Sequence, residues 1–194
     1  MIKQALLGGS FDPIHSGHLH LAREILKSGL VDSVVFLPNA RHNFKQDKVL
    51  LDYAQRYQLV QNALEQGMEV WDDDASGSGY TSELLERLFN KYPDRKFYWV
   101  LGSDNLAKLR QWHDFQWLRV NVRFLIVPRP GYSQHDRILV RLKRRTLKME
   151  PCPISSTLVR DRIRAGKSIT GLVPLQLEQR IIELYRPLLT NNGH

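Results

Sequence analysis

Short apolar runs alternate with amphipathic stretches along the chain, and the two patterns predict two kinds of element. The brief apolar runs, most of them rich in β-branched or aromatic residues, predict strands over residues 4–7, 33–37, 69–71, 97–101 and 123–127. The amphipathic stretches predict helices over residues 17–27, 51–66, 81–91, 105–109, 155–165 and 175–185. Within residues 51–66, Tyr57, Val60 and Leu64 follow one another at steps of three and four, as one buried helix face requires.

This order of elements predicts the α/β fold class, with a Rossmann-like parallel sheet flanked by helices and joined by right-handed crossovers. The length of 194 residues suits one domain over residues 1–194, with a small helical C-terminal part at about residues 155–190. Ligands of open parallel sheets bind outside the carboxyl ends of the strands. We therefore expect the ligand-binding residues in the loops over residues 8–16, 38–48, 72–80, 102–104 and 128–135.

Composition narrows the class of protein without choosing a function. Hydrophobic residues make up 42% of the chain and charged residues 25%, which are ordinary values for a globular protein. No apolar run approaches the ~18–20 residues that span a bilayer. Cys152 is the single cysteine, which excludes an intrachain disulfide, and no Cys/His cluster has zinc-ligand spacing. We therefore expect a cytoplasmic protein that binds no membrane.

The chain is basic, with 28 Lys and Arg against 20 Asp and Glu and a net charge of +8. Part of the excess lies in residues 137–148, which hold Arg141, Lys143, Arg144, Arg145 and Lys148. Such a balance attracts polyanions, either nucleic acid or a small phosphorylated ligand. Taken alone, this basic run is typical of a solvated helix face. The charge therefore favours a phosphate-bearing partner without choosing its size.

The first predicted strand leads into GGSFDPIHSGH at residues 8–18, called the histidine loop below. Gly8 and Gly9 lack a Cβ, so the backbone can turn sharply and bring its N–H groups close to a ligand. His15 and His18 are three residues apart, which places both rings on one face of the first helical turn. The start of a helix attracts anions through its free N–H groups and its dipole. Two imidazole donors at this position predict a phosphate clamp, and Gly17 leaves room there for a flat ring or a phosphate chain.

Each part of the histidine loop also has an ordinary structural explanation. A Gly-Gly pair after a strand is usually a turn, and a lone histidine is usually structural. Two histidines at this spacing could be metal ligands, but no third ligand is evident nearby. The combination of a strand, two glycines, a proline and His-x-Gly-His is more specific than its parts, and it favours phosphate binding.

A second motif, PISSTLVR, occupies residues 153–160 and is called the serine motif below. Three hydroxyl residues at a helix start can cap the helix and leave N–H and O–H donors for an anion. Arg160 follows Ser156 by four positions, so its guanidinium lies on the same face as these donors. An ordinary N-cap with a surface arginine would explain the motif alone, but the histidine loop makes a joint anion site the better explanation.

Together the two motifs resemble the signatures of the nucleotidyltransferase superfamily, G-x-F-x-P-x-H-x-G-H and I-S-S-T-x-x-R. The resemblance implies that His15 and His18 contact the triphosphate of ATP and stabilise the transition state at the α-phosphate. It also implies that Arg160 holds the β- and γ-phosphates, which makes these three the expected catalytic residues. The implied ATP-binding set is Gly8, Gly9, Ser10, Phe11, His15, Gly17, His18, Gly102, Asp104, Ile154, Ser155, Ser156, Thr157 and Arg160.

The middle of the chain resembles the nicotinate-nucleotide adenylyltransferases of that superfamily, through LGSDNL at residues 101–106, Trp112, PRPGY at residues 128–132 and the segment 79–81. The resemblance implies that the G-x-D segment helps to bind adenosine and mononucleotide, and that Trp112 stacks on the pyridine ring. The ordinary roles are an N-cap for Asp104 and a core position for Trp112. The implied mononucleotide-binding set is Lys45, Tyr80, Thr81, Trp112 and Arg129.

One segment departs from that family. After the second strand the family usually carries P-P-H-K, whereas residues 37–45 here read LPNARHNFK. Lys45 can take the place of the lysine that faces phosphate, but Phe44 replaces the histidine and the proline pair is absent. A lysine in a basic loop is usually just solvated, so the sequence leaves the choice between nicotinate and nicotinamide mononucleotide open.

The resemblance implies a direct reaction between two small-molecule substrates, ATP and nicotinate mononucleotide, which gives deamido-NAD and pyrophosphate in NAD biosynthesis. Nicotinamide mononucleotide is the alternative pyridine mononucleotide. The phosphate of the mononucleotide attacks the α-phosphorus of ATP in line and pyrophosphate leaves, so the protein supplies positioning and charge stabilisation. Mg²⁺ is expected to bridge the phosphates mainly through water, with few protein ligands and no dedicated metal site. The sequence leaves the oligomeric state open, a homo-oligomer included.

Two kinds of alternative remain. Pantetheine-phosphate adenylyltransferase and the cytidylyltransferases share the histidine loop, although their chains are usually shorter or lack the pattern from Gly102 to Trp112. Outside enzymes, the charge of +8 would suit a non-enzymatic nucleic-acid-binding protein. The sequence carries no signature of a nucleic-acid-binding module, so nucleic acid is the less favoured partner.

Overall fold

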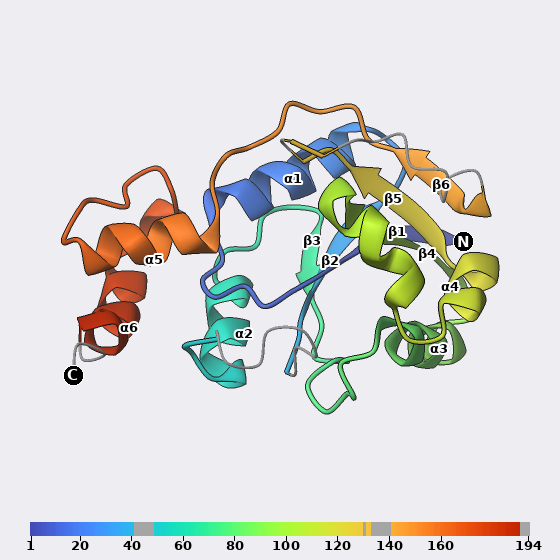
Figure 1. Cartoon of the computed structure of the whole chain (residues 1–194), viewed down its shortest axis with the longest axis horizontal. Coiled ribbons are helices and arrows are strands. Elements are labelled where there is room, and N and C mark those ends of the chain that lie inside the picture. The colour runs from blue at the N-terminus through green and yellow to red at the C-terminus, as the bar shows by residue number, and fades with distance from the viewer. Residues whose placement is uncertain (41–48, 130, 133–140, 191–194) are drawn as a thin grey trace.

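The computed structural model describes residues 1–40, 49–129, 131–132 and 141–190, and these residues form one twisted sheet with helices on both faces (Figure 1). The described strands are β1 (Ile2–Gly9), β2 (Ser33–Pro38), β3 (Met68–Val70), β4 (Arg95–Gly102), β5 (Arg123–Val127) and β6 (Lys143–Thr146). Their order in the sheet is β3-β2-β1-β4-β5-β6, and every neighbouring pair is parallel. The predicted Rossmann-like α/β fold is confirmed.

The described helices are α1 (Ser16–Lys27), α2 (Tyr53–Gln61), α3 (Thr81–Lys91), α4 (Phe115–Asn121), α5 (Ser156–Arg164) and α6 (Glu178–Thr190), with 3-10 turns η2 (Ser103–Gln111) and η4 (Leu175–Leu177). The prediction for α3 is confirmed at both ends. The predicted helix over residues 51–66 was too long, because Asp52 caps α2 and the chain turns after Gln61 to enter β3. The prediction missed α4, whose first turn is fixed by Asp114 Oδ1 accepting from Trp117 N–H at 3.3 Å.

The basic run was wrongly expected to be a helix face. Its described part contains β6, which pairs with β5 from Arg123 opposite Lys143 to Ile126 opposite Thr146. All four residues of β6 are exposed, and they form one edge of the sheet. Lys and Arg side chains on such an edge discourage pairing with another chain. Four basic or polar residues without apolar alternation gave no strand signal in the sequence.

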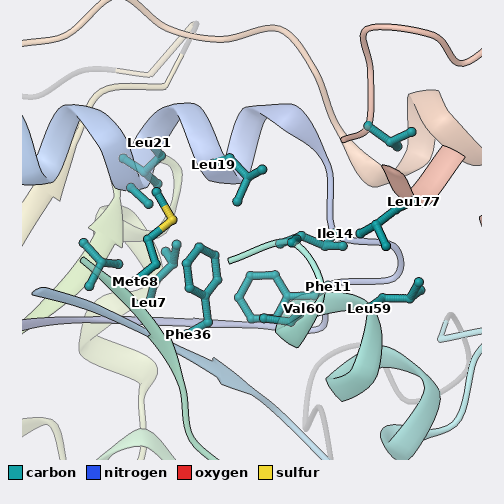
Figure 2. Close-up of a cluster of buried hydrophobic side chains, with 14 of the residues drawn as sticks. Leu7, Phe11, Ile14, Leu19, Leu21, Phe36, Leu59, Val60, Met68 and Leu177 are labelled. Carbon is teal, nitrogen blue, oxygen red and sulfur yellow. The ribbon is translucent and has the colours of Figure 1, made fainter. Parts of the chain in front are cut away.

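Side chains that alternate along β1 divide the core between the two faces of the sheet. Ala5 and Leu7 join a cluster with α1, α2, α5 and α6, part of which Figure 2 shows around Phe36 and Met68. Leu6 joins a second cluster with α3, η2 and α4. Because both faces are covered, the central strands are apolar almost throughout, as parallel sheets require.

The C-terminal helices α5 and α6 lie at one end of the molecule, away from the β6 edge (Figure 1). They are tied to the sheet domain by the first cluster, which includes Val159, Ile163 and Ile181. The backbone N–H of Ser16, at the start of α1, also donates to the carbonyl of Leu172 at 2.8 Å. The C-terminal part is therefore anchored beside the histidine loop. Among the described residues, no helix has both the length and the apolar character to cross a membrane.

Candidate active site

The histidine loop lies at the carboxyl edge of the sheet. It leaves β1 at Gly9 and ends in the first turn of α1, where His15 is the N-cap. Phe11 has a positive φ of 48°, and its buried ring contacts Phe36 and His18. The carbonyl of Gly9 accepts from the N–H of Asn39 at 3.0 Å, so the loops after β1 and β2 leave the sheet side by side.

His15 and His18 form a stacked pair at the start of α1. Their ring centroids are 3.7 Å apart with 25° between the ring planes. The backbone N–H of His15 donates to Nδ1 of His18 at 3.3 Å, so the proton of a neutral His18 ring is on Nε2. Nδ1 of His15 is buried and has no hydrogen-bond partner among the described residues. The pair thus contains one buried ring nitrogen, Nδ1 of His15, that no described group satisfies.

Both rings are neutral at physiological pH. Burial, and after it the positive charge of Arg129, lowers the pKa of His15 from 6.5 to about 3. Burial, His15 and Arg129 together lower the pKa of His18 well below 6.5. A neutral imidazole donates one hydrogen bond and carries no charge. The sequence predicted the two rings as donors, but it did not reveal the burial that keeps them neutral.

Packing in the structure explains why residue 17 is a glycine. A Cβ at this position would lie 3.0 Å from the His15 ring and 3.0 Å from the carbonyl oxygen of Ile154. The room predicted for a ligand is therefore partly filled by the histidine and by the serine motif. The absence of a side chain lets these two motifs, far apart in the sequence, come into contact.

The serine motif is joined to the histidine loop by two hydrogen bonds. Ser156 Oγ donates to the carbonyl of Pro13 at 2.9 Å, and Nη1 of Arg160 donates to the carbonyl of Asp12. Ser155 is the N-cap of α5, and its Oγ accepts from the N–H of Leu158 at 3.1 Å. Ser155 therefore caps the helix as predicted, and Arg160 is held beside the histidine loop, while the anion site stays a prediction.

Asp12 and Arg56, which have no predicted role, both hold the site loops in place. The buried carboxylate of Asp12 accepts from the backbone N–H of Leu50 at 2.8 Å and of Leu51 at 3.2 Å. It also accepts from the hydroxyl of Tyr185 at 2.6 Å. Nothing in the sequence distinguished this aspartate from an ordinary loop residue, because its partners lie on other segments.

Arg56 is only 2% exposed although it is charged. Its guanidinium donates to three main-chain carbonyls, those of Ser10 at 2.6 Å, Asn39 at 2.9 Å and Leu51 at 3.2 Å. Burial lowers the pKa of this arginine. The burial of Arg56 could have been predicted from the sequence, since Arg56 precedes Val60 by four residues and shares the buried face of α2.

The segments that follow β4 and β5 bring Asp104 and Arg129 together. Arg129 N–H donates to Ser103 Oγ at 2.9 Å, and its Nε lies 3.9 Å from Asp104 Oδ1. Asp104 is not the N-cap expected from its position, because Gly102 is the N-cap of η2 and no side chain caps that turn. Asp104 Oδ1 is buried and has no hydrogen-bond partner among the described residues.

Two of the predicted mononucleotide residues, Tyr80 and Thr81, lie at the start of α3. Tyr80 is the N-cap of α3 and stacks on His113, with ring centroids 4.3 Å apart, and Thr81 begins the helix. Ser82 Oγ lies 3.0 Å from Nδ1 of His113, which fixes the neighbouring Trp112 segment against α3. Trp112 is half-buried and packs against the second core cluster. Lys45 and Phe44 lie outside the described residues.

The comparisons with known proteins identify the family of the chain. A family model described as cytidylyltransferase-like matches residues 6–162, which include both motifs. A probable nicotinate-nucleotide adenylyltransferase of Clostridium novyi is 34% identical over 186 residues, covering 90% of this chain and 93% of the relative. One of Bacillus pumilus is 30% identical over 187 residues, covering 94% and 97%. The chain therefore belongs to the cytidylyltransferase-like family of nucleotidyltransferases, among its nicotinate-nucleotide adenylyltransferases.

Solved structures support the fold. The nicotinic acid mononucleotide adenylyltransferase of Plasmodium falciparum, complexed with NaAD, superposes with a TM-score of 0.81 at 21% identity, covering 94% of this chain and 96% of that one. A putative nicotinate-nucleotide adenylyltransferase of Vibrio parahaemolyticus superposes with a TM-score of 0.66 at 22% identity, covering 94% and 99%. At these identities the likeness concerns the arrangement of sheet and helices.

Proposed function

We propose that the chain transfers the adenylyl group of ATP to nicotinate mononucleotide, giving deamido-NAD and pyrophosphate. The observation that carries the proposal is the direct contact between the histidine loop and the serine motif. The hydrogen bonds from Ser156 to Pro13 and from Arg160 to Asp12 place a helix start, two imidazoles and a guanidinium at the carboxyl edge of β1. These groups suit a triphosphate, and the relatives' names supply the substrate.

The reaction needs no covalent intermediate. A phosphate oxygen of the mononucleotide forms a bond to the α-phosphorus of ATP, and the bond from that phosphorus to the bridging oxygen breaks as pyrophosphate leaves. Nε2–H of His18 donates to the oxygens where negative charge increases, and the N–H groups at the start of α1 add their dipoles. Arg160 neutralises the departing pyrophosphate. The protein thus contributes position and electrostatic stabilisation.

The divalent ion belongs to the substrate in this proposal. Among the described residues, no three His, Cys, Asp or Glu side chains form a cluster that could hold a metal. ATP brings Mg²⁺ on its own phosphates, and Mg²⁺ retains several water ligands when it binds in such sites. The ion lowers the charge on the phosphates, while His15, His18 and Arg160 supply the protein's contacts.

A substrate panel tests the proposed function. Steady-state rates with ATP should give the highest kcat/KM for nicotinate mononucleotide, lower values for nicotinamide mononucleotide, and no turnover of pantetheine phosphate. A preference for pantetheine phosphate would refute the proposal.

Nucleic-acid binding is the second candidate function, and the basic strand β6 is the observation that favours it. Filter binding across a salt series measures nucleic-acid affinity, because phosphate-backbone binding falls steeply with salt.

Arg160→Lys should weaken ATP and pyrophosphate together and spare the mononucleotide. Lysine keeps the charge but loses the forked donors that reach both Asp12 and a phosphate. We expect the Kd for ATP to rise about tenfold, the loss of about one charge-assisted hydrogen bond, as measured by calorimetry. Arg162→Lys, on the same helix α5, is the control and should leave ATP affinity unchanged. Unchanged ATP affinity in Arg160→Lys would show that Arg160 holds the histidine loop without binding ATP.

Trp112→Ala should lose mononucleotide affinity while the protein stays folded. A stacking platform beneath the pyridine ring contributes roughly 1–2 kcal/mol, by analogy with base–aromatic stacking. A tryptophan that served only the core would instead cost about 3–5 kcal/mol of unfolding free energy. Trp117→Ala is the matched control, because Trp117 packs against the same cluster from α4. Normal mononucleotide affinity in Trp112→Ala, or an unfolded variant, would contradict the prediction.

A further inference from the structure

The C-terminal helix contributes one polar group to the neighbourhood of the active site. Tyr185, on α6, is completely buried, and its hydroxyl donates to Oδ1 of Asp12 at 2.6 Å. Burial, with the negative charge of Asp12 next, raises the pKa of Tyr185, so the hydroxyl keeps its proton and remains a donor. The family match ends at residue 162, and Tyr185 lies beyond it.

Asp12 receives hydrogen bonds from two separate directions. Besides Tyr185, its carboxylate accepts from the backbone N–H groups of Leu50 and Leu51, which lead into α2. The carboxylate is thus bonded both to α6 and to the segment that leads into α2, and Oδ1 accepts from Tyr185 and from Leu51. A buried carboxylate that loses one of its donors shifts or draws in water, because an unsatisfied charge is costly.

Asp12 in turn holds Arg160. The guanidinium donates through Nη1 to the carbonyl of Asp12, and the same nitrogen lies 3.8 Å from its carboxylate oxygen Oδ2. The second amino nitrogen, Nη2, donates to Thr157 Oγ1 at 3.4 Å. The position of the guanidinium therefore depends on the position of Asp12, both through a hydrogen bond and through charge.

Asp12 also lies within the histidine loop, three residues before His15. Displacement of its carbonyl would affect the loop and the arginine together. Tyr185 itself is fixed by apolar packing, because Ile181 and Leu189 of the same helix are buried in the first core cluster. Packing of α6 against the core therefore fixes the position of the Tyr185 hydroxyl.

We propose that Tyr185 is a positioning residue for the ATP half of the site, which acts through Asp12 on Arg160 and on the histidine loop. The proposal rests on the proposed function for its link to ATP. The expected effect of Tyr185 is on binding of the triphosphate alone. Binding of the mononucleotide, around Tyr80 and Trp112, should therefore be unaffected.

Tyr185→Phe removes the hydroxyl and keeps the ring in the core. We expect the KM and the calorimetric Kd for ATP to rise about fivefold to tenfold, the cost of weakening one hydrogen bond to a charged group. The KM for the mononucleotide should stay unchanged and kcat should fall by less than threefold. Tyr98→Phe, on β4, is the matched control and should leave all three constants unchanged. Equal ATP affinity in Tyr185→Phe and wild type would overturn the proposal.

A double-mutant cycle separates positioning from a merely structural role. In an Arg160→Ala background, Tyr185→Phe should raise the Kd for ATP by less than threefold, since Arg160, one of the two groups that Tyr185 positions, is gone. A full fivefold rise in that background would show that Tyr185 does not act through Arg160. Because calorimetry needs no turnover, ATP affinity tests Tyr185 even if wild type does not use nicotinate mononucleotide, and that failure would count against the proposed function alone.

Discussion

His18→Ala should lower kcat about 100-fold while it changes the Kd for ATP by less than about threefold. The geometry gives the reason. His18 is locked by the His15 N–H on its Nδ1 and by ring contacts with His15 and Phe11, so its Nε2–H is the donor on the other side of the ring. A preorganised donor of this kind matters most when charge increases on the α-phosphate, and losing one costs on the order of 3 kcal/mol.

A pair of amide variants tests which nitrogen donates. The side-chain amide of Gln reaches the position of Nε2, and that of Asn only the position of Nδ1. His18→Gln should therefore retain more activity than His18→Asn. His20→Ala, two residues farther along α1, is the control and should leave kcat unchanged. Near-normal turnover in His18→Ala, measured by pyrophosphate release, would remove His18 from the mechanism.

Arg56→Met should lower the free energy of unfolding by about 3–5 kcal/mol. The substitution keeps much of the apolar stem and leaves the carbonyls of Ser10, Asn39 and Leu51 without their buried donor. Because these carbonyls lie on loops after two strands, ATP affinity should also fall. Urea denaturation, followed by fluorescence, measures the change.

Another arginine provides the comparison. Arg23 forms a bidentate salt bridge with Glu65, in which Nε donates to Oε2 at 2.7 Å and Nη2 donates to Oε1 at 2.6 Å. Both side chains are substantially exposed. Exposed pairs of this kind contribute at most about 1 kcal/mol, so Arg23→Met should be nearly neutral. Equal effects of the two substitutions would show that burial of Arg56 adds nothing to stability.

The fold was predictable where apolar periodicity is strong. The helix α3 and the strand β5 have the expected bounds, because buried Leu84, Leu85 and Leu88 recur at helical spacing and Phe124 to Val127 form one apolar run. The strand β6 has no apolar pattern, since it lies exposed at an edge. The helix α4 depends on Asp114, with a φ of 46° and a cap on Trp117, which local propensity does not reveal.

The site was predictable where one segment carries the whole motif. Spacing alone placed His15 and His18 at the start of a helix, and the serine motif was placed at the start of another. The residues that hold these motifs in place were not predictable, because Asp12 and Tyr185 are far apart in the sequence and meet only after folding. The neutral state of the histidines depends on burial in the same way.

Transfer of the adenylyl group is tested most directly by following labelled α-phosphate. With ATP that carries ³²P at the α-position, nicotinate mononucleotide and Mg²⁺, the label should appear in a dinucleotide with the mass of deamido-NAD, and unlabelled pyrophosphate should form in equal amount. Protein quenched during turnover should carry no covalent label, because the mononucleotide phosphate attacks directly. Label that stays in ATP or AMP, or that remains bound to the protein, would contradict adenylyl transfer by this site.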